Sequence, residues 1–358
     1  MKSIQLSYLL GSIALLTAIT SCHKDKIVNN QTTPTAQRAG IYILDQGYSS
    51  QLSALTYYDY TTKTLTPDIF SSVNGRSLGN TANDVEIYGS KMYITVDKSG
   101  TVEVLNAKTA KSIKQVKFLN GDKDSTSKEP RSIAFYNGNA YISLYNGTVA
   151  VMDTITYTVS KYIPVGNDPE QLAVANGKLY VANSGGLNYP AVDSTVSVIN
   201  LSTSTVTKTI TVGPDPYAVS VDSYGNVYVA AYGVYGSSNA SLTIINSGTD
   251  AVTSRNNSYT GGPFAINGNN AFYIDGDGTI KIFNVKTFTA TTTNFISDGT
   301  TFVAPFAIAT DPLSGEVFVT DAKNYSSNGL IYAFDKTGKK EYSLTTGINP
   351  GSIILVNK

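Results

Sequence analysis

The sequence predicts an all-β fold: a seven-bladed β-propeller of four-stranded antiparallel blades, closed by pairing of the N- and C-terminal strands. Three observations predict it: a strand motif repeated at intervals of 39 to 48 residues, a half-repeat at each end of the array, and a composition rich in turn and strand formers. Four-stranded propeller blades typically repeat every 40–45 residues or so, about the interval seen here. A β-sandwich needs no fixed period, and a β-helix repeats at much shorter intervals.

The repeated motif is a proline, a short apolar strand, a Gly or Asn turn, and then Tyr or Phe followed by Ile or Val. Copies start at Pro130, Pro169, Pro216, Pro263 and Pro305, and a copy without the proline starts at Ala82. Asn137-Gly138 and Asn176-Gly177 are dipeptides that favour two-residue hairpin turns. Further apolar runs follow each copy, as in residues 194–213, and supply the third and fourth strands.

The seventh blade is divided between the two ends of the array. Residues 350–356 contain the proline and the first strand only, whereas residues 40–45 and 52–70 supply the three later strands. Joining these ends closes the ring and removes the free sheet edges of an open array.

The composition agrees with this fold and narrows the function. Only 15% of the residues are charged, and the chain has 25 Tyr but no Trp. Acidic and basic residues number 26 each, so no net field favours nucleic acid or an anionic surface.

The N-terminal residues resemble an export signal. Lys2 precedes the mostly apolar residues 4–19, and Ile19-Thr20-Ser21-Cys22 resembles the lipobox of bacterial lipoproteins. We therefore expect a signal peptide at 1–21, a flexible lipidated tether at 22–39 and the propeller at 40–358. Cys22 is the only cysteine, so no disulfide within the chain can stabilise the fold.

Two motifs carry a resemblance to a known family. Tyr180-Val181-Ala182-Asn183 and Phe318-Val319-Thr320-Asp321 resemble the YVTN repeat of YncE-type propellers. Residues 40–59 and 74–94 are similar to a narrower group of outer-membrane lipoproteins, which includes surface cobalamin-binding propellers working beside vitamin B12 transporters. The resemblance implies a lipid-anchored protein of the outer membrane, with the side of the membrane left open.

The irregular residues gather on one face of the predicted propeller. Long connections between second and third strands cover residues 45–53, 183–194, 231–241 and 321–329, whereas the opposite turns are minimal. The long connections carry Tyr48, Tyr189, Tyr232, Tyr235 and Tyr325 among Gly, Ser and Asn. Tyrosine and small polar residues are typical of binding loops, although tyrosine is frequent throughout this chain.

A second set of candidate residues follows each blade proline, at the start of the innermost strand. This ring is Asn83, Arg131, Glu170, Tyr217, Phe264, Phe306 and Gly351. The three aromatic residues, which lie on consecutive blades, would form an apolar wall opposite Arg131 and Glu170, as in many small-molecule pockets. Alternatively, the aromatic residues only fill the channel.

Enzyme motifs are weak. The only histidine, His23, lies on the tether, so the propeller has no histidine base or metal ligand. Gly75-Arg76-Ser77-Leu78-Gly79 fits the G-x-S-x-G pattern, but we expect it in a blade crossover without a partner histidine. The Asp275-Gly-Asp277-Gly segment lacks the rest of a calcium loop and is typical of a turn.

The function expected from the sequence is therefore non-catalytic. We expect a monomeric propeller that captures a small ligand or nutrient, such as a cobalamin-like molecule, and assists an outer-membrane transporter. We expect it to bind no cofactor, metal or nucleic acid. One alternative is a carboxylate-dependent lactonase or hydrolase using Asp45, Asp97 and Asp321, which we expect at the ends of equivalent strands. A second alternative is an adhesion or protein-interaction scaffold.

Overall fold

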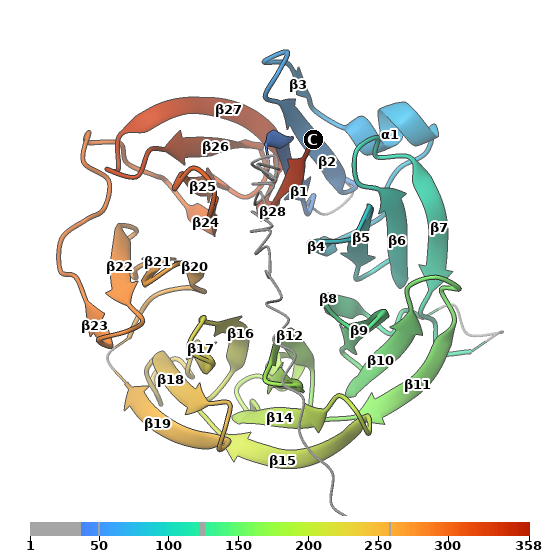
Figure 1. The fold of residues 1–358 in the computed structure, drawn as a ribbon, viewed down its shortest axis with the longest axis vertical. Helices are drawn as coiled ribbons and strands as arrows, with labels where there is room; N and C mark the ends of the chain where they lie inside the picture. The colour runs from blue at the N-terminus through green and yellow to red at the C-terminus, as the bar shows by residue number, and fades with distance from the viewer. Residues whose placement is uncertain (1–36, 49–50, 122–125, 258) are drawn as a thin grey trace, which may run out of the picture. The chain divides into compact units, whose positions relative to one another are not determined.

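The computed structural model describes residues 37–48, 51–121, 126–257 and 259–358. Within these residues, seven four-stranded antiparallel sheets are arranged around one axis (Figure 1). The predicted seven-bladed propeller is confirmed. The predicted signal peptide, Cys22 and His23 lie outside the described residues.

Each blade runs outward from the axis, and Figure 1 labels its strands. The first blade contains β28 (Pro350–Asn357), β1 (Arg38–Asp45), β2 (Ala54–Asp59) and β3 (Leu65–Thr66). The second blade contains β4 (Ala82–Tyr88), β5 (Lys91–Val96), β6 (Thr101–Asn106) and β7 (Ser112–Lys117). The third blade contains β8 (Pro130–Tyr136), β9 (Asn139–Leu144), β10 (Thr148–Asp153) and β11 (Val159–Pro164).

The remaining four blades follow the same order. The fourth blade contains β12 (Pro169–Ala175), β13 (Lys178–Asn183), β14 (Thr195–Asn200) and β15 (Thr205–Thr211). The fifth blade contains β16 (Pro216–Val221), β17 (Asn226–Ala231), β18 (Ser241–Asn246) and β19 (Ala251–Asn256). The last two contain β20 (Ala265–Asn267), β21 (Asn270–Ile274), β22 (Ile280–Asn284), β23 (Thr289–Ala290), and β24 (Pro305–Thr310), β25 (Val317–Asp321), β26 (Asn328–Phe334), β27 (Lys340–Ile348). Short helices α1 (Ile69–Asn74) and η1 (Gly186–Asn188) lie in connections.

The strand pairing follows from local sequence. Tyr136 pairs with Asn139 across Asn137-Gly138, both of which have positive φ, 45° and 78°. Asn and Gly adopt these angles most readily, so the dipeptide sets the hairpin register.

The aromatic residue of each repeat forms the core of its blade. The seven residues at this register position of the second strand are all buried: Tyr42, Tyr93, Tyr141, Tyr180, Tyr228, Phe272 and Phe318. Burying one such ring stabilises the fold by roughly 1.5–3 kcal/mol, so one aromatic residue per repeat holds neighbouring blades together. The YVTN-like motif is thus explained by packing.

The ring closes as the split repeat predicts, since Ile41 pairs with Leu355 and Ile43 with Ile353. The strand β1 begins at Arg38, two residues before the predicted boundary. Arg38 donates hydrogen bonds to Asn357 and Asp311, which extend the pairing to that point.

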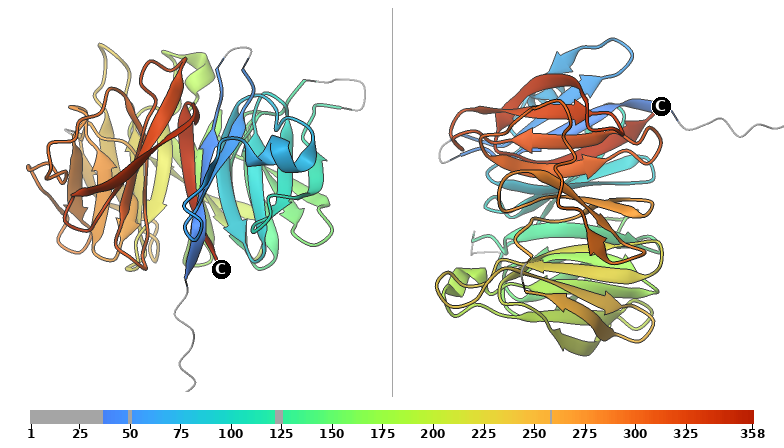
Figure 2. Two further views of the ribbon diagram at one scale, coloured as in Figure 1. Left: turned by 90° about the horizontal axis from the view of Figure 1, so that it is seen from above. Right: turned by 90° about the vertical axis from the view of Figure 1, so that its left-hand side faces the viewer.

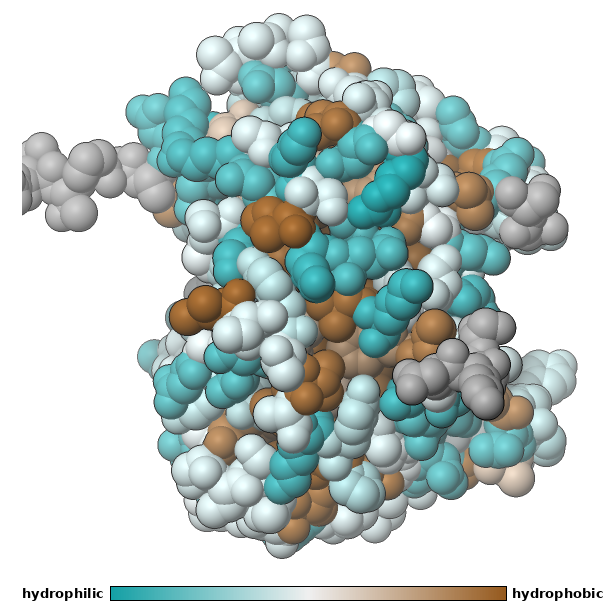
Figure 3. All heavy atoms as spheres, turned by 90° about the vertical axis from the view of Figure 1, so that its right-hand side faces the viewer, coloured by the Kyte–Doolittle hydropathy of each residue, from teal (hydrophilic) through white to brown (hydrophobic). Residues whose placement is uncertain are grey.

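The outer edges of the blades are polar. Most residues of β7 and β11 are exposed and include Lys114 and Lys161. Figure 3, which faces this side, shows hydrophobic residues in separate patches among hydrophilic ones. Lysines on edge strands disfavour pairing with another chain.

The propeller has two unlike faces (Figure 2). We call the face with the β13–β14 and β17–β18 connections, residues 184–194 and 232–240, the loop face. The opposite face, with the turns at 137–138 and 176–177, is the turn face. Arg38 at the start of β1 and Asn357 at the end of β28 pair on the turn face. In the part of the chain that the structure describes, no helix has the length and apolarity needed to cross a bilayer.

Candidate functional site

The loop face carries a charged cluster built from two repeated positions of the blade. One position follows the blade proline and holds Arg131 and Glu170, and the other directly follows the second strand and holds Asp97 and Tyr145. We call these four residues the Arg131 cluster. Arg131 donates from Nε to Glu170 Oε2 at 3.1 Å, from Nη2 to Glu170 Oε1 at 3.2 Å and from Nη1 to Asp97 Oδ2 at 2.6 Å. The predicted pair Arg131 and Glu170 is therefore in direct contact.

Tyr145 completes the cluster, with its ring stacked against the guanidinium group of Arg131. The Arg131 carbon Cζ lies 4.4 Å from the centroid of the Tyr145 ring, and the Tyr145 hydroxyl donates to Glu170. A cation over an aromatic face and a bidentate carboxylate pair both fix the orientation of an arginine. The cluster joins three neighbouring blades.

Burial and charge oppose each other within the cluster. Burial raises the pKa of Asp97, and the Arg131 charge lowers it only in part. Burial alone would lower the pKa of Arg131, but Glu170, Tyr145 and Asp97 hold it above its usual value. Arg131 therefore remains a cation held between the carboxyl groups of Glu170 and Asp97.

An aromatic pair lies beside the Arg131 cluster. The rings of Tyr217 and Tyr232 are stacked with centroids 3.6 Å apart and planes 7° apart. Tyr217 is further oriented by donating its hydroxyl to Gly261 O at 3.3 Å. Tyr232 is 60% exposed, so the pair offers one ring face to solvent.

Asp215 links this pair to the charged cluster. The Tyr232 amide donates to Asp215 O at 3.0 Å. Burial, and then the negative charge of Glu170, raise the pKa of Asp215 to about 6. Burial and these two carboxylates also raise the pKa of Tyr232 to about 12. Asp215 forms no ion pair with the described residues.

A second contact joins two of the predicted loop tyrosines. The amide of Tyr235 donates to the Tyr189 hydroxyl at 3.0 Å, connecting the β13–β14 and β17–β18 loops. Tyr235 is 97% exposed, and Leu187 of η1 is also exposed. These side chains form the outer border of the loop face over two neighbouring blades.

Two further predicted residues meet on another blade. Phe306 and Tyr325 form an edge-to-face pair with centroids 5.9 Å apart. Tyr48 is exposed on the first blade, where its backbone pairs with Gln51, and its ring stacks on no aromatic residue of the described part of the chain.

Of the three aromatic residues of the expected wall, Tyr217, Phe264 and Phe306, Phe264 is the most buried. This ring is 8% exposed and packs against Tyr228 of the neighbouring blade, Tyr259 and Phe283. The residue precedes β20, where the chain has left the regular strand, so the ring can turn into the blade. An apolar ring gains more by this burial than by lining a wet surface.

Sequence reasoning missed Tyr145 and Asp215. A signal for Tyr145 exists, because Asp97, Tyr145 and Tyr232 each directly follow the second strand of a blade. Asp215 directly precedes a blade proline and has a positive φ of 55°. A comparison of these two repeat positions across blades would have found both residues.

The three carboxylates of the predicted alternative site do not converge. Asp45 accepts a hydrogen bond from Thr56 at 2.7 Å, Asp97 pairs with Arg131, and Asp321 accepts from the amides of Val303 and Ala304. Asp97 lies one residue beyond the expected position, which Val96 occupies at the end of β5. Among residues 37–48, 51–121, 126–257 and 259–358, no group of three or more His, Cys, Asp or Glu could hold a metal ion.

The two remaining sequence motifs have structural explanations. Ser77 of the G-x-S-x-G match is exposed and follows helix α1, whose C-cap is Gly75, so the helix precedes the serine instead of following it. Asp275 and Asp277 flank the turn between β21 and β22, where both contact Lys281. This matches the predicted turn.

Comparisons with solved structures identify similar folds. A quinonprotein alcohol dehydrogenase-like protein from Bacteroides thetaiotaomicron is 16% identical, with a TM-score of 0.66 over 89% of this chain and 79% of that one. Hydrazine synthase from Kuenenia stuttgartiensis is 14% identical, with a TM-score of 0.60 over 75% of this chain and 93% of that one. The computationally designed Ika8 protein is 15% identical, with a TM-score of 0.57 over 90% and 98%. Such low identities concern the fold alone.

Sequence comparison provides the family. No curated protein matches the chain. Residues 39–349, nearly the whole propeller, match the model of a family described as a domain of unknown function, DUF5074. The chain therefore belongs to the DUF5074 family.

Proposed function

We propose that the chain is a non-catalytic lipoprotein of the outer membrane, anchored through Cys22, that captures a small nutrient on its loop face and assists a transporter. The observation that carries this proposal is the exposed Tyr232 ring, stacked on Tyr217 beside the Arg131 cluster. An aromatic surface bordered by a few oriented polar groups is the usual design of a small-molecule site.

The ligand that suits this surface is flat and carries polar groups at its edge. Tyr232 and Tyr235 offer ring faces and hydroxyl groups at a low entropy cost, since each ring has only two rotatable side-chain bonds. Tyr217 holds the Tyr232 ring in place, so this ring loses little conformational freedom when a ligand binds. A cobalamin-like molecule has this character, in agreement with the sequence resemblance.

Ligand capture is tested with residues 22–358 carrying Cys22→Ser. We expect cobalamin or a related nutrient to raise the melting temperature, because a ligand that binds only the folded state stabilises it. Tyr232→Ala should weaken binding by at least about tenfold, as for an interface anchor. Tyr224→Ala is the matched control, because Tyr224 is an exposed tyrosine on the turn face. A ligand bound equally well by both variants would rule out the loop-face site.

Anchoring is tested separately in cells. We expect labelled palmitate to be incorporated into the wild-type chain and not into Cys22→Ser, with the chain recovered in the outer-membrane fraction. Recovery of an unlabelled chain in the soluble fraction would contradict lipid anchoring and leave ligand capture to its own test.

A further inference from the structure

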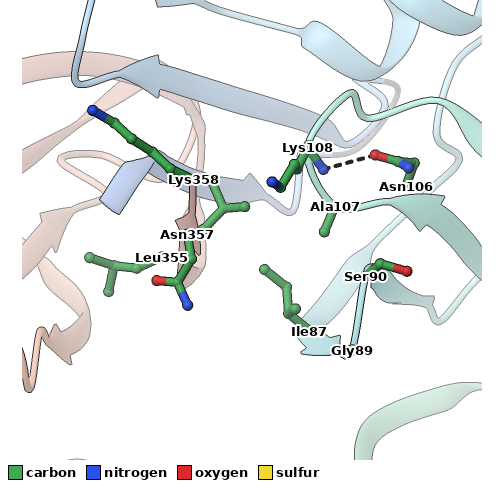
Figure 4. A pocket seen from close by; sticks show the side chains of 10 residues that line it. Ile87, Gly89, Ser90, Asn106, Ala107, Lys108, Leu355, Asn357 and Lys358 are labelled. Atoms are coloured by element: carbon green, nitrogen blue, oxygen red, sulfur yellow. Dashed lines mark hydrogen bonds between the residues drawn. The ribbon is translucent and has the colours of Figure 1, made fainter. Parts of the chain in front are cut away.

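The turn face contains a pocket that the proposed ligand capture does not use. It has a volume of about 330 Å³ and lies between the first blade and the β4–β7 blade. Figure 4 shows Ile87 and Ala107 on one side and Leu355 and Asn357 on the other. This volume is within the range of small-molecule sites, roughly 300–1,000 Å³.

The pocket arises from one small residue in a repeated turn. The Ala107 amide donates to Ser90 O at 3.0 Å, just as Leu201 donates to Gly177 O at 3.1 Å and Val285 to Asn269 O at 2.9 Å. Leu201 and Val285 occupy the same turn position in other blades, and both are buried. Ala107 leaves empty the space that these larger side chains fill.

The lining has an apolar floor and a positively charged border. Ile87, Ala107, Leu355 and Val356 provide hydrocarbon, and Ser90, Asn106 and Asn357 provide neutral polar groups. Among the residues that the structure describes, no Asp or Glu lines the pocket. Lys108 and Lys358 are its charged residues.

Of the two lysines, Lys108 is the more available to bind an anionic ligand. Its ammonium group forms no ion pair with a described residue, and its backbone amide is held by Asn106 Oδ1 at 3.0 Å. Lys358 is partly balanced by Asp59, whose pKa lies below its usual value because of hydrogen bonds from Thr62 and Thr61 and, to a smaller extent, the Lys358 charge. The argument therefore depends mainly on Lys108.

An equivalent pocket elsewhere on the turn face lacks these features. It has a volume of about 580 Å³ and lies between the β12–β15 and β16–β19 blades. Ser247 and Gly248 stand there in place of Ala107 and Lys108, and Asp222 is part of the lining. The same position in the fold is thus polar without a lysine in one pocket and apolar with lysines in the other.

From this combination we propose that the Ala107 pocket binds an anionic amphiphile, with its hydrocarbon segment against Ile87, Ala107 and Leu355 and its carboxylate or phosphate at Lys108. Hydrocarbon burial supplies affinity in proportion to the area covered, and the unpaired ammonium group selects the sign of the charge. The ligand is either a lipid of the anchoring membrane or a free amphiphile.

Lys358, which lines the pocket, donates its amide to Gln37 O at 2.9 Å, so the pocket lies where the described chain begins. A membrane lipid and a free amphiphile present the same chemistry to it, a hydrocarbon segment with an anionic end, and the vesicle experiment below distinguishes the two sources.

The test uses residues 22–358 carrying Cys22→Ser and titration calorimetry with octyl phosphate below its micelle concentration. We expect one saturable site, and binding at least about tenfold weaker for inorganic phosphate and for octyltrimethylammonium. The first probe lacks the chain, and the second reverses the charge. Amide NMR shifts should change at residues 87–90, 106–108 and 355–358.

Two variants examine the two halves of the site. Lys108→Gln should weaken octyl phosphate binding about fivefold and remove most of its salt dependence. Lys286→Gln is the matched control, because Lys286 follows Asn284 in the same turn of another blade and its amide is bonded to Asn284 Oδ1 at 3.0 Å. Ala107→Leu should fold, since Leu201 occupies the equivalent turn, and should weaken binding at least about tenfold by filling the pocket.

Absence of saturable octyl phosphate binding would overturn the proposal. Equal effects of Lys108→Gln and Lys286→Gln, or unchanged binding by Ala107→Leu, would also overturn it. Vesicles of phosphatidylglycerol and of phosphatidylcholine then distinguish the source. Lys108-dependent binding to the first alone supports a membrane lipid, and binding of octyl phosphate without vesicle binding supports a free amphiphile.

Discussion

The guanidinium group of Arg131 donates two hydrogen bonds to the carboxylate of Glu170, at 3.1 and 3.2 Å, and so joins the first strands of two neighbouring blades. The same group donates to Asp97 of the preceding blade at 2.6 Å. One side chain thus connects three blades at the loop face. This arrangement makes the candidate site part of the structural support of the ring.

We expect Arg131→Met to lower the free energy of unfolding by about 3 kcal/mol, because it leaves the buried Asp97 carboxylate without its partner. Urea denaturation measures this loss. Lys98→Met is the control, since Lys98 is 49% exposed and its pairs, with Glu129 at 2.6 Å and with Asp97 at the longer distance of 3.9 Å, should contribute at most about 1 kcal/mol. Similar losses for the two variants would show that the Arg131 cluster adds nothing beyond a surface ion pair.

We expect Glu170→Gln to lower the pKa of Asp215 below its value of about 6. Burial is the larger cause of the raised pKa and stays in place, but the repulsion from Glu170 disappears. Carboxyl carbon NMR shifts followed from pH 3 to pH 8 or so cover this titration. Glu129→Gln serves as the control and should leave Asp215 unchanged. An unchanged pKa in Glu170→Gln would assign the whole effect to burial.

We expect Asp45→Asn to stabilise the chain increasingly as pH rises. Burial raises the pKa of Asp45 from 3.8 to about 8, so between these values the folded chain holds a proton that the unfolded chain releases. Wild-type stability therefore falls by up to about 1.4 kcal/mol per pH unit over this window and levels off above it. The asparagine cannot ionise, and Asn183 at the same position of another blade already donates to Ser197 Oγ at 3.0 Å.

Asp321→Asn provides the contrast, because Asp321 ends the corresponding strand β25. Its two carboxylate oxygens accept from the amides of Val303, Ala304 and Lys323. An asparagine would turn a donor toward one of these amides and cost about 1–3 kcal/mol. Urea denaturation at several pH values measures both variants. A pH-independent gain in Asp45→Asn would contradict the buried, protonated carboxyl.

We expect Phe264→Ala to cost about 3–5 kcal/mol of unfolding free energy, as for other buried aromatic residues. Phe306→Ala should cost clearly less, since the Phe306 ring is only half-buried and its aromatic contact is Tyr325. Urea denaturation compares the two variants. Equal costs would contradict the assignment of Phe264 to the blade interior and Phe306 to the loop face.

Much of the fold could be predicted because its determinants are local and repeated. A two-residue turn such as Asn137-Gly138 sets one register wherever it occurs, and an aromatic residue every blade marks each second strand. The repeat position correctly places Arg131, Glu170, Tyr217 and Phe306 at the start of a first strand. It does not give the burial of Phe264, because the direction of a side chain just outside a strand depends on which neighbours offer burial.

The sequence by itself determined the seven-bladed ring, its closure by β1 and β28, and the division into a loop face and a turn face. These depend on periodicity, turn chemistry and strand patterning, which short segments encode. Only the tertiary structure decided that Arg131 reaches two carboxylates from neighbouring blades and that Ala107 leaves a pocket. Both features depend on the distance between adjacent blades, and that distance is set by packing of the whole ring.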